Sequence, residues 1–418
     1  MNLAEELKAR GLVQQEGGGS LEEILKEKRT VYLGVDPTAD SLHVGNMVPV
    51  MLLRHLREAG NKVIFLIGGG TGMIGDPRES GERTLLDSKV VAKNTKAIRA
   101  QMAPIFGKHR LTYVDNAVWI SRLGAIEFLR DVGKHFTVNQ LVKRDIIKKR
   151  LDAEDPISFT EFSYSLLQGY DYWHLNKKYG VDLQVGGSDQ WANIISGVDL
   201  VRRKEGKDVY AITTPIITEK GSGKKFGKSE GNAIWLDPKK TSPFQFYQFW
   251  LNIADDSVDE YLKIFTLFPL SDIEAILNEH TPRPQERIAQ KKLAHAVTTL
   301  VHGKSTADTV ARISGILFNG ESLTTLGRGE RSTLLSEVPH KAVHTRTLRE
   351  GVLITTLLVD TGLSSSQSDA RRLIEGKGVS VGGVKVEKPD ALLSKESSPG
   401  EMILLRRGKQ VAIIVIEK

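Results

Sequence analysis

The chain has 418 residues and no cysteine, and its 58 Lys and Arg against 51 Asp and Glu give a formal net charge of +7, which fits an anionic partner such as a nucleotide or RNA. This length allows about two to four domains, and a composition of 40% hydrophobic and 26% charged residues is typical of globular proteins. Membrane proteins are excluded because no apolar run reaches about 18 residues, and disulfide or cysteine-thiolate proteins because cysteine is absent.

The first half of the chain alternates strand and helix patterns. Residues 1–10 have a helical pattern without the apolar core of a secretory signal, so we expect a cytoplasmic protein. Apolar runs typical of buried strands follow at 31–35, 63–67, 111–114 and 181–185, with helical patterns between them. This alternation predicts a doubly wound, mostly parallel sheet of the Rossmann type. The helical stretch 124–150, inserted between the third and fourth runs, is suited to packing against another helix, as in a dimer.

The second half has a different pattern. From about 242 to 300 the periodicity is helical alone, which predicts an all-α domain. Between about 321 and 349 the chain is rich in Gly, Ser, Thr and charge, a composition typical of linkers. Residues 351–418 combine a helix at 366–375 with short strands, which predicts a small α+β domain. The pair His340 and His344 lies in the linker-like stretch without a third ligand, so we predict no metal site there.

A polar turn follows the first strand. The chain passes from Gly34 through an Asp-Pro pair into a predicted helix with Asp40 or Ser41 as its N-cap. Free N–H groups at a helix N-terminus can hold a phosphate. His43 and Asn46 lie three residues apart with a glycine between them, so a flat base could rest on the face that they share. For this pattern alone, an ordinary turn with a surface histidine is at least as common.

A second polar feature is the stretch 220–229, which is rich in glycine and contains four lysines. Such lysines can make contacts to a polyphosphate that form fully only in the transition state. Taken by itself, a run of charge is usually a solvated loop.

Together, the two features resemble the HIGH and KMSKS signatures of class I aminoacyl-tRNA synthetases, and the match is closest to the bacterial tyrosyl-tRNA synthetases. The resemblance covers essentially the whole chain, and its blocks keep the family's order: DPTADSLH at 36–43, GDP at 75–77, SFTEFSY at 158–164, GGSDQW at 186–191 and KFGK at 225–228. It implies a tyrosine–tRNA ligase that forms tyrosyl-adenylate from L-tyrosine and ATP and transfers tyrosyl to the 3'-terminal adenosine of tRNA(Tyr). It also implies a homodimer, Mg²⁺ that enters with ATP, and no tightly bound metal or organic cofactor.

The family's organisation implies four segments. These are a Rossmann-type catalytic domain at 1–230 with a helical dimerisation insertion at about 120–155, an α-helical domain for the anticodon arm at 231–325, a linker at 326–349, and an S-four-like RNA-binding domain at 350–418. In the last segment, a face for RNA phosphates would need local clustering of basic side chains, with Arg371, Arg372 and Lys377 as the first candidates and Arg406, Arg407 and Lys409 as further ones.

The resemblance also implies a tyrosine pocket. Tyr32 and Asp171 would bind the phenol, while the ammonium would be bound by Asp76, Tyr164 and Gln168, with Gln184 and Gln190 as supporting residues. The helical spacing of Tyr164, Gln168 and Asp171, at i, i+4 and i+7, places the three on one helix face. Without the surrounding match, the aromatic residues of this helix would be interpreted as ordinary core.

For ATP, the resemblance implies electrostatic catalysis without a covalent nucleophile. The catalytic residues would be Thr38, His43, Asn46, Lys225 and Lys228, and further ATP contacts would come from Gly34, Asp36, Gly45, Gly187, Asp189, Phe226 and Ser229. Ser188 and Asp189 could instead simply cap a helix. Arg83 is a further candidate for pyrophosphate. Asn46 stands where the close bacterial relatives usually have His, and Phe-Gly replaces the class consensus Met-Ser, while both lysines are kept.

Two other interpretations stay open. Residues 70–75 spell GxGxxG after a strand, the dinucleotide fingerprint of an oxidoreductase, but Asp-Pro follows directly and no acidic residue ends a strand about 20 positions on. Alternatively, the chain is an RNA-binding protein on a retired synthetase body. Asn46 is the one hint of this, whereas the retained Tyr32, Asp171 and motif lysines speak against it.

Overall fold

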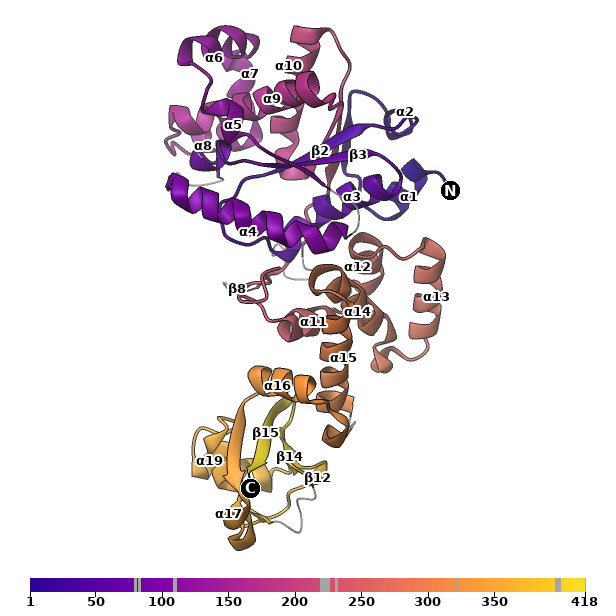
Figure 1. Cartoon of the computed structure of the whole chain (residues 1–418), viewed down its shortest axis with the longest axis vertical. Helices are drawn as coiled ribbons and strands as arrows, with labels where there is room; N and C mark the ends of the chain where they lie inside the picture. Colours follow the sequence, from indigo (N-terminus) through magenta and orange to yellow (C-terminus); the bar gives the residue numbers. More distant parts are fainter. Residues whose placement is uncertain are drawn as a thin grey trace. The chain divides into compact units, whose positions relative to one another are not determined.

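The computed structural model of the chain describes residues 1–78, 81, 84–107, 111–218, 226–229, 232–319, 322–394 and 400–417. The chain forms two compact units (Figure 1). The first consists of Met1–Thr241 with Phe249–Gly303, and the second of Ser242–Gln248 with Lys304–Lys418.

Within its described residues, the first unit contains a six-stranded sheet in the order β1-β6-β5-β2-β3-β4. Strands β6, β5, β2, β3 and β4 are parallel, and β1 pairs with β6 as an antiparallel edge strand. The bounds are β1 (Gln15–Gly17), β2 (Thr30–Val35), β3 (Lys62–Ile67), β4 (Thr112–Asp115), β5 (Leu183–Gly187) and β6 (Tyr210–Thr214). The four predicted strands correspond to β2–β5, and the doubly wound parallel sheet is confirmed. The sequence reading missed β1 and β6.

Helices cover both faces of this sheet. Figure 1 shows α3 and α4 on one side and α9 and α10 on the other. The helices of the sheet-containing part are α1 (Leu3–Ala9), α2 (Leu21–Ile24), η1 (Val44–Asn46), α3 (Met47–Glu58), η2 (Thr71–Met73), α4 (Ser88–Phe106), α5 (Ala117–Ile120), α6 (Ala125–Asp131), η3 (Gly133–His135), α7 (Val138–Leu141), α8 (Asp145–Asp152), α9 (Phe159–Tyr179), η4 (Ser188–Gln190) and α10 (Trp191–Glu205). The helical insertion predicted from the sequence corresponds to α6–α8.

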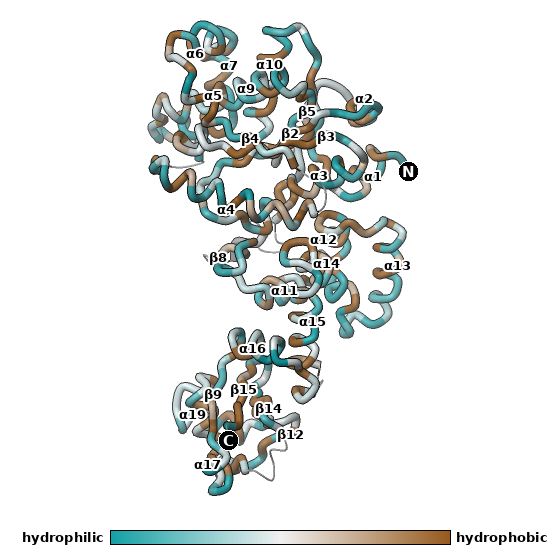
Figure 2. The backbone as a smooth tube through the Cα atoms, viewed as in Figure 1, coloured by the Kyte–Doolittle hydropathy of each residue, from teal (hydrophilic) through white to brown (hydrophobic). Residues whose placement is uncertain are grey.

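The central strands supply the core. Figure 2 shows hydrophobic colour along β2 and β3, and every residue of β3 after Lys62 is buried. Parallel strands are covered on both faces, which explains why their sequences are continuous apolar runs instead of alternating patterns. On one face, Tyr32, Ile64 and Leu66 pack in a common cluster with Tyr172 and Ile194 from α9 and α10.

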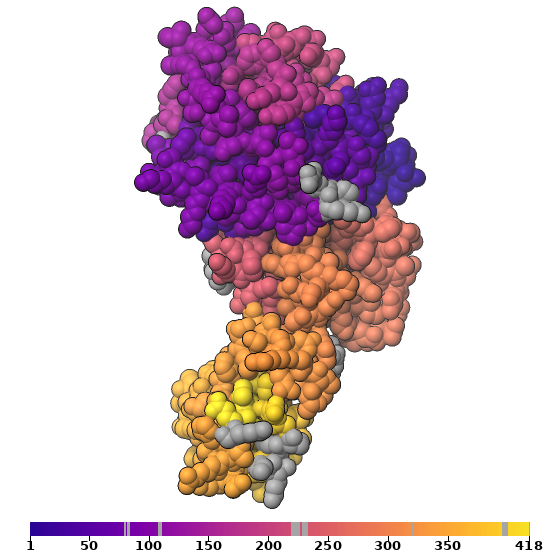
Figure 3. Space-filling model, viewed as in Figure 1, coloured from indigo at the N-terminus to yellow at the C-terminus, as the bar shows by residue number. Residues whose placement is uncertain are grey.

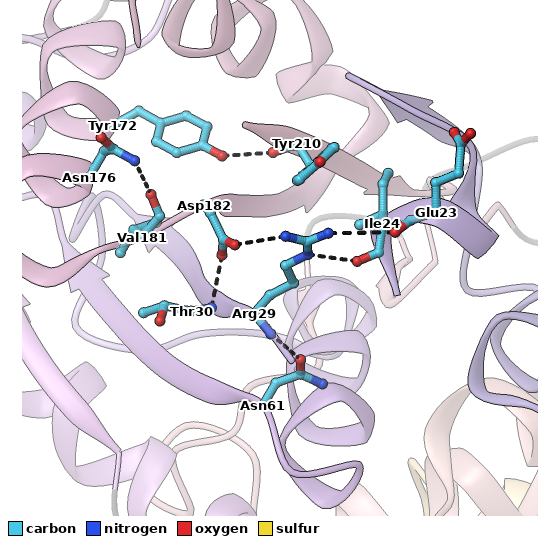
Figure 4. Close-up of polar contacts among 10 residues, drawn as sticks. All are labelled: Glu23, Ile24, Arg29, Thr30, Asn61, Tyr172, Asn176, Val181, Asp182 and Tyr210. Atoms are coloured by element: carbon cyan, nitrogen blue, oxygen red, sulfur yellow. Dashed lines mark hydrogen bonds and ion pairs between the residues drawn. The ribbon is translucent and has the colours of Figure 1, made fainter. Parts of the chain in front are cut away.

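A polar network fixes the amino ends of β2 and β5 (Figure 4). The Arg29 guanidinium donates to the Asp182 carboxylate at 3.1 Å, and the other oxygen of Asp182 accepts from the Thr30 backbone N–H at 2.9 Å. The backbone N–H of Arg29 donates to Asn61 Oδ1 at 2.8 Å, just before β3 begins. These contacts hold three neighbouring strands together at the edge of the sheet opposite their carboxyl ends.

Further helices belong to the first unit. They are α12 (Val258–Phe265), α13 (Leu270–His280), η5 (Pro284–Glu286) and α14 (Ile288–His302), while α11 (Pro243–Leu251) lies at the boundary of the two units. The sequence predicts these helices within a separate domain. In the structure, α12 packs on α3 and α14 on α4, and the buried Arg10 donates to the carbonyls of Lys263 and Phe268 at 3.1 and 2.7 Å.

The second unit has a five-stranded sheet in the order β12-β11-β14-β15-β9 among its described residues, and a small pair β10-β13. Its elements are α15 (Lys304–Asn319), η6 (Leu323–Thr325), α16 (Arg328–Glu337), β9 (His340–His344), α17 (Thr345–Glu350), β10 (Val352–Leu353), α18 (Ile354–Asp360), α19 (Gln367–Glu375), β11 (Val379–Val381), β12 (Val384–Lys385), β13 (Leu392–Leu393), β14 (Met402–Arg407) and β15 (Gln410–Glu417). The predicted helix at 366–375 corresponds to α19, whose N-cap is Ser366.

The stretch 326–349, predicted as a linker, carries regular structure. It contains α16, β9 and most of α17, and β9 pairs in parallel with β15 near the end of the chain. The sequence analysis missed β9 because the segment has few apolar residues. β9 is an edge strand whose side chains are mostly exposed, apart from the buried Val343. The domain boundaries given above stay a prediction.

Candidate active site

A cavity of about 330 Å³ lies at the carboxyl ends of β2, β5 and β6. In doubly wound folds, ligands bind at this edge of the sheet. The cavity brings together residues that the sequence analysis singled out separately: Tyr32, Gly34, Asp36, Thr38, His43, Gly45, Asn46, Asp76, Tyr164, Gln168, Asp171, Gln184, Gly187, Asp189, Gln190 and Phe226. Lys225 and Arg83 lie outside the described residues, as do the side chains of Lys228 and Ser229.

The deep end of the cavity has a buried phenol and a buried carboxylate. Tyr32 is fully buried, and no hydrogen-bond partner for its hydroxyl is present among the described residues. Asp171 accepts from Asn116 Nδ2 at 2.8 Å with one oxygen and from Trp119 Nε1 at 2.7 Å with the other. Burial raises the pKa of Asp171 to about 7, against the lowering effect of these two hydrogen bonds. Each carboxylate oxygen can accept a further donor, such as a phenolic O–H.

Asn116 and Trp119, which hold Asp171, were missed by the sequence reading. Asn116 is fully buried directly after β4; its Nδ2 also donates to Thr71 Oγ1 at 2.9 Å, and its Oδ1 accepts from the Gly70 N–H at 2.7 Å. The Trp119 ring stacks on His174 with centroids 4.4 Å apart. The position of Asn116 at a strand's carboxyl end was a usable signal.

A second buried carboxylate lies at Asp76. Its oxygens accept from Gln190 Nε2 at 2.8 Å and from Asn193 Nδ2 at 3.0 Å. Burial raises the pKa of Asp76 to about 6, although both hydrogen bonds favour the ionised form. Asn193 was also missed, yet it follows Gln190 by three residues and so faces the same way. Nearby, the buried Gln184 Oε1 has no hydrogen-bond partner in the described part of the chain.

Tyr164 is paired with a carboxylate in this structure. Its hydroxyl donates to Asp36 Oδ2 at 2.7 Å, and Thr71 Oγ1 donates to Asp36 Oδ1 at 2.6 Å. Burial raises the pKa of the Tyr164 phenol well above its usual value, so the hydroxyl keeps its proton. As a neutral hydroxyl it can still accept a hydrogen bond from a ligand cation.

The GxGxxG stretch packs tightly against the turn after β2. A Cβ on Gly68, just before it, would overlap Asp36 Oδ1, and a Cβ on Gly72 would lie 2.9 Å from Pro37 Cδ. Among the described residues after the third glycine, Gly75, the next helix is α4, which begins only at Ser88. These glycines therefore permit close packing, and the dinucleotide interpretation loses its structural basis.

The predicted helix start at Asp40 or Ser41 is wrong. The N-cap is His43, whose Nδ1 accepts from the Gly45 N–H at 3.1 Å, while Asn46 Oδ1 accepts from the His43 N–H at 3.1 Å. These two reciprocal hydrogen bonds pair backbone N–H groups at the start of the helix. Asp40 instead forms an ion pair with Lys240. Because Nδ1 accepts, the neutral imidazole carries its proton on Nε2 and can donate there.

Within the lysine-rich stretch, the described residues Phe226 and Gly227 lie against the His43 turn. The Phe226 N–H donates to the Ile217 carbonyl at 2.9 Å, and the Gly227 carbonyl accepts from Ile234 at 3.0 Å. Gly227 has φ +73°, and a Cβ there would overlap Val44 Cγ2. The Phe226 ring lies 4.6 to 5.6 Å, centroid to centroid, from four other aromatic rings: Phe249, Trp250, Tyr261 and Phe265. The backbone next to Lys225 and Lys228 is therefore anchored beside His43.

The alternative role of Ser188 and Asp189 as helix caps finds no support in the hydrogen bonds. The N-cap of η4 is Gly187, without a side-chain cap, and Asp189 lines the cavity. An acidic side chain at this strand end can accept from ribose hydroxyls.

The described residues contain no group of three or more His, Asp or Glu side chains that could hold a metal ion. In the same residues, no helix has the length and apolar character needed to cross a membrane. In the second unit, Arg371, Arg372 and Lys377 are exposed. By contrast, the guanidinium groups of Arg406 and Arg407 donate to the backbone carbonyls of Leu317 and Leu363.

Comparisons with known proteins found similar families, relatives and solved structures. Residues 25–319 match the protein family described as tRNA synthetases class I (W and Y), and residues 331–415 match the tyrosine–tRNA ligase SYY-like C-terminal domain. The tyrosine–tRNA ligase of Bacteroides thetaiotaomicron is 43% identical over 431 aligned residues, covering 100% of both chains. That of Anaeromyxobacter dehalogenans is 44% identical over 414 residues and 98% of each chain.

Solved structures show the same similarity. A C-terminally truncated mitochondrial tyrosyl-tRNA synthetase from Aspergillus nidulans is 35% identical, with a TM-score of 0.68, and the match covers 76% of this chain and 94% of that chain. The Archaeoglobus fulgidus tyrosyl-tRNA synthetase, solved with L-tyrosine, shares the fold at 19% identity, with a TM-score of 0.52 over 74% of this chain and 100% of that chain.

Proposed function

The chain belongs to the tyrosine–tRNA ligases, a family of class I aminoacyl-tRNA synthetases, and we propose that it activates L-tyrosine with ATP and transfers the tyrosyl group to the 3'-terminal adenosine of tRNA(Tyr). One observation carries the choice of amino acid. The buried Tyr32 hydroxyl lacks a hydrogen-bond partner among the described residues, and it lines the same cavity as the Asp171 carboxylate. A phenolic hydroxyl of a bound tyrosine would satisfy the first and donate to the second.

The proposed ammonium site is built on Asp76. An ionised carboxylate opposite an ammonium is the expected charge pairing, and the hydrogen bonds from Gln190 and Asn193 hold Asp76 in one orientation. Tyr164 and Gln168, which line the cavity, would complete this site. Gln184 Oε1, which has no hydrogen-bond partner among the described residues, would supply a further acceptor. The tyrosine carboxylate would then lie toward the His43 side of the cavity.

The proposed ATP site extends from Asp189 to the His43 turn. Gly34, Gly45 and Gly187 line the cavity without side chains and leave room for adenosine, Asp189 would accept from the ribose, and Thr38 and Asn46 lie where the phosphates are expected. His43 would donate from Nε2 to a phosphate oxygen. Lys225 and Lys228, which flank the anchored Phe226 and Gly227 in sequence, would stabilise the developing charge.

The reaction then needs no covalent enzyme intermediate. In the first step, a tyrosine carboxylate oxygen attacks the α-phosphorus in line, the bond to the bridging oxygen of the β-phosphate breaks, and pyrophosphate leaves. In the second step, the terminal ribose hydroxyl of tRNA attacks the carbonyl carbon of tyrosyl-adenylate, loses its proton, and AMP leaves. Side chains contribute position and electrostatic stabilisation.

Magnesium would arrive as the ATP complex. In that complex the metal would be held mainly by the substrate phosphates. A cation bound to the phosphates would offset part of their charge during the first step. We place this chemistry in the cytoplasm, where ATP and tRNA are available.

We further propose that the enzyme is a homodimer that meets its partner through the insertion α6–α8 and the start of α9. Large apolar side chains are exposed there, including Ile126 at 77% and Phe159 at 73%, together with Leu129 and Val138. In Figure 3, the purple residues of this insertion form part of the outer surface of the first unit. Several exposed large apolar side chains on one small part of the chain are typical of an interaction site. In sedimentation experiments, the native chain should be a dimer and Leu129→Glu a monomer.

Aminoacylation tests the proposed function directly. The purified chain should attach radiolabelled tyrosine to tRNA in a reaction that requires ATP, with tRNA(Tyr) preferred over other tRNAs. Arg371→Ala with Arg372→Ala should lower the rate at limiting tRNA without changing tyrosine activation, because these exposed side chains are assigned to RNA alone. Activation without any transfer to tRNA would contradict the second step.

A further inference from the structure

We propose that Asn94 and Gln101 of α4 are positioning residues for the ATP reaction, because they hold the loop that carries Thr38 and His43. The inference rests on the proposed function and deepens it. Neither residue lines the cavity, so each acts through the loop. In this proposal, α4 helps to position active-site residues although Asn94 and Gln101 do not line the cavity.

The loop from Asp36 to His43 has little regular structure of its own. Residues 36–42 belong to no helix or strand, and the Thr38 N–H donates back to Asp36 at 2.9 Å. Yet Ser41 and Leu42 are only 4% exposed each. Buried backbone groups need hydrogen-bond partners, and here neighbouring strands do not supply enough of them.

Side chains of α4 supply the missing partners. Asn94 Nδ2 donates to the Pro37 carbonyl at 2.9 Å. Gln101 Oε1 accepts from the Leu42 N–H at 2.9 Å, and its Nε2 donates to the Asp40 carbonyl at 3.3 Å. The two amides thus fix both ends of the segment that separates Thr38 from His43.

The spacing of the two residues fits one surface of the helix. Asn94 and Gln101 are seven positions apart, about two turns, and therefore share a face. Ile98 lies between them and lines an adjoining cavity of about 380 Å³ together with Thr38 and His43. The face of α4 that carries Asn94 and Gln101 therefore also lines this adjoining cavity, next to Thr38 and His43.

The opposite side of the loop is held by the segment that follows the lysine motif. The Val44 N–H donates to the Ile234 carbonyl at 3.0 Å, and the Leu236 N–H donates to the Leu42 carbonyl at 2.8 Å. The Asp237 N–H donates to Ser41 Oγ at 3.1 Å. Removal of the α4 amides would leave the loop fixed on one side only, so Thr38 and His43 would be misplaced relative to ATP.

Pyrophosphate exchange with tyrosine and ATP tests the inference. The variants Asn94→Ala and Gln101→Met remove the hydrogen bonds, and Gln101→Glu keeps the acceptor for the Leu42 N–H. Thr95→Ala is the matched control, since Thr95 lies half-buried on the same helix and its hydroxyl has no hydrogen-bond partner among the described residues. Melting temperature and tyrosine affinity by equilibrium dialysis accompany the kinetics.

We expect Asn94→Ala and Gln101→Met to lower kcat/KM for ATP by about 10- to 100-fold, with tyrosine affinity unchanged. The kcat/KM of Gln101→Glu for ATP should lie between those of Gln101→Met and the native chain. Thr95→Ala should match the native chain. ATP kinetics equal to those of the native chain, or a uniform loss that also weakens tyrosine binding, would overturn the inference. If Gln101→Met does not fold, the comparison of kcat/KM for ATP between Asn94→Ala and Thr95→Ala tests the inference by the same criteria. A native chain without exchange would instead contradict the proposed function, and the inference with it.

Discussion

The indole N–H of Trp119 donates a 2.7 Å hydrogen bond to the carboxylate of Asp171. With the amide of Asn116 on the other oxygen, it holds the carboxylate in one orientation at the deep end of the cavity. Asn116 directly follows β4 and Trp119 lies on α5, whereas Asp171 stands on α9. The orientation of the Asp171 carboxylate, and with it the proposed recognition of a phenol, therefore depends on partners from outside α9.

Asp171→Asn should lower kcat/KM for tyrosine activation by about 100-fold, because the amide offers the phenol a weaker acceptor and clashes in hydrogen bonding with the Asn116 and Trp119 donors. Trp119→Phe keeps the Asp171 carboxylate and should lower kcat/KM for tyrosine activation by about 10-fold. Both are measured by pyrophosphate exchange with the melting temperature as control. A Trp119→Phe enzyme with native kinetics would show that the hydrogen bond does not orient Asp171.

The rate of tyrosine activation should rise with pH in two steps. Burial raises the pKa of Asp76 to about 6 and that of Asp171 to about 7. The proposed roles, Asp76 for the ammonium and Asp171 for the phenol, both require the ionised form. Hence kcat/KM for tyrosine should increase through these two values and then level off. Asp171→Asn should retain only the lower step. A native profile that is flat over this range would contradict the assignment.

Stability should change with pH in the opposite sense. Both carboxyl groups have a pKa raised above the unfolded value of 3.8, so the fold favours their neutral forms. Their contribution to the free energy of unfolding is fully present below about pH 4 and is lost as the pH rises through the folded values. Urea unfolding of the native chain and of Asp171→Asn at a series of pH values should show a shallower fall in the variant.

Phe226 should matter for ATP and not for tyrosine. Phe226→Ala leaves a void among Phe249, Trp250, Tyr261 and Phe265 and releases the backbone that adjoins the motif lysines. We expect kcat for activation to fall by about 10- to 100-fold while tyrosine affinity stays native. Phe226→Met, which refills most of the volume, is the control and should recover most of the activity. Equal activity of the two variants would show that the aromatic contacts do not position the motif.

The Arg29–Asp182 pair should affect stability alone. The pair (Figure 4) lies at the amino ends of β2 and β5, whereas the cavity lies at the carboxyl ends of the strands. Asp182→Ala removes acceptors for the Arg29 guanidinium and the Thr30 N–H, and should lower the free energy of unfolding by about 1–3 kcal/mol. The kinetic constants of the folded variant should match the native ones, and a specific loss of ATP or tyrosine affinity would be unexpected.

The sequence could predict those features that depend on local spacing. The central strands are continuous apolar runs, and Tyr164, Gln168 and Asp171 repeat with the helical period, so both were visible without coordinates. Residues known from the family resemblance, such as Tyr32 and Asp76, line one cavity in the structure. Their roles nevertheless stay proposals that the measurements above are designed to test.

The missed residues act over long distances in sequence. Asn116 and Trp119 reach Asp171 from 55 and 52 residues away, and Asn193 reaches Asp76 across 117. No periodicity relates such partners, because the fold alone brings them together. The same holds for β9, an edge strand whose pairing partner β15 lies near the chain's end.

Exchange of labelled pyrophosphate into ATP, compared between tyrosine and phenylalanine, tests most directly that Tyr32 and Asp171 read a phenolic hydroxyl. We predict exchange with tyrosine, a rate at least about 100-fold lower with phenylalanine, and a much smaller preference in Asp171→Asn. Equal exchange with both amino acids, or a preference that persists unchanged in Asp171→Asn, would contradict it.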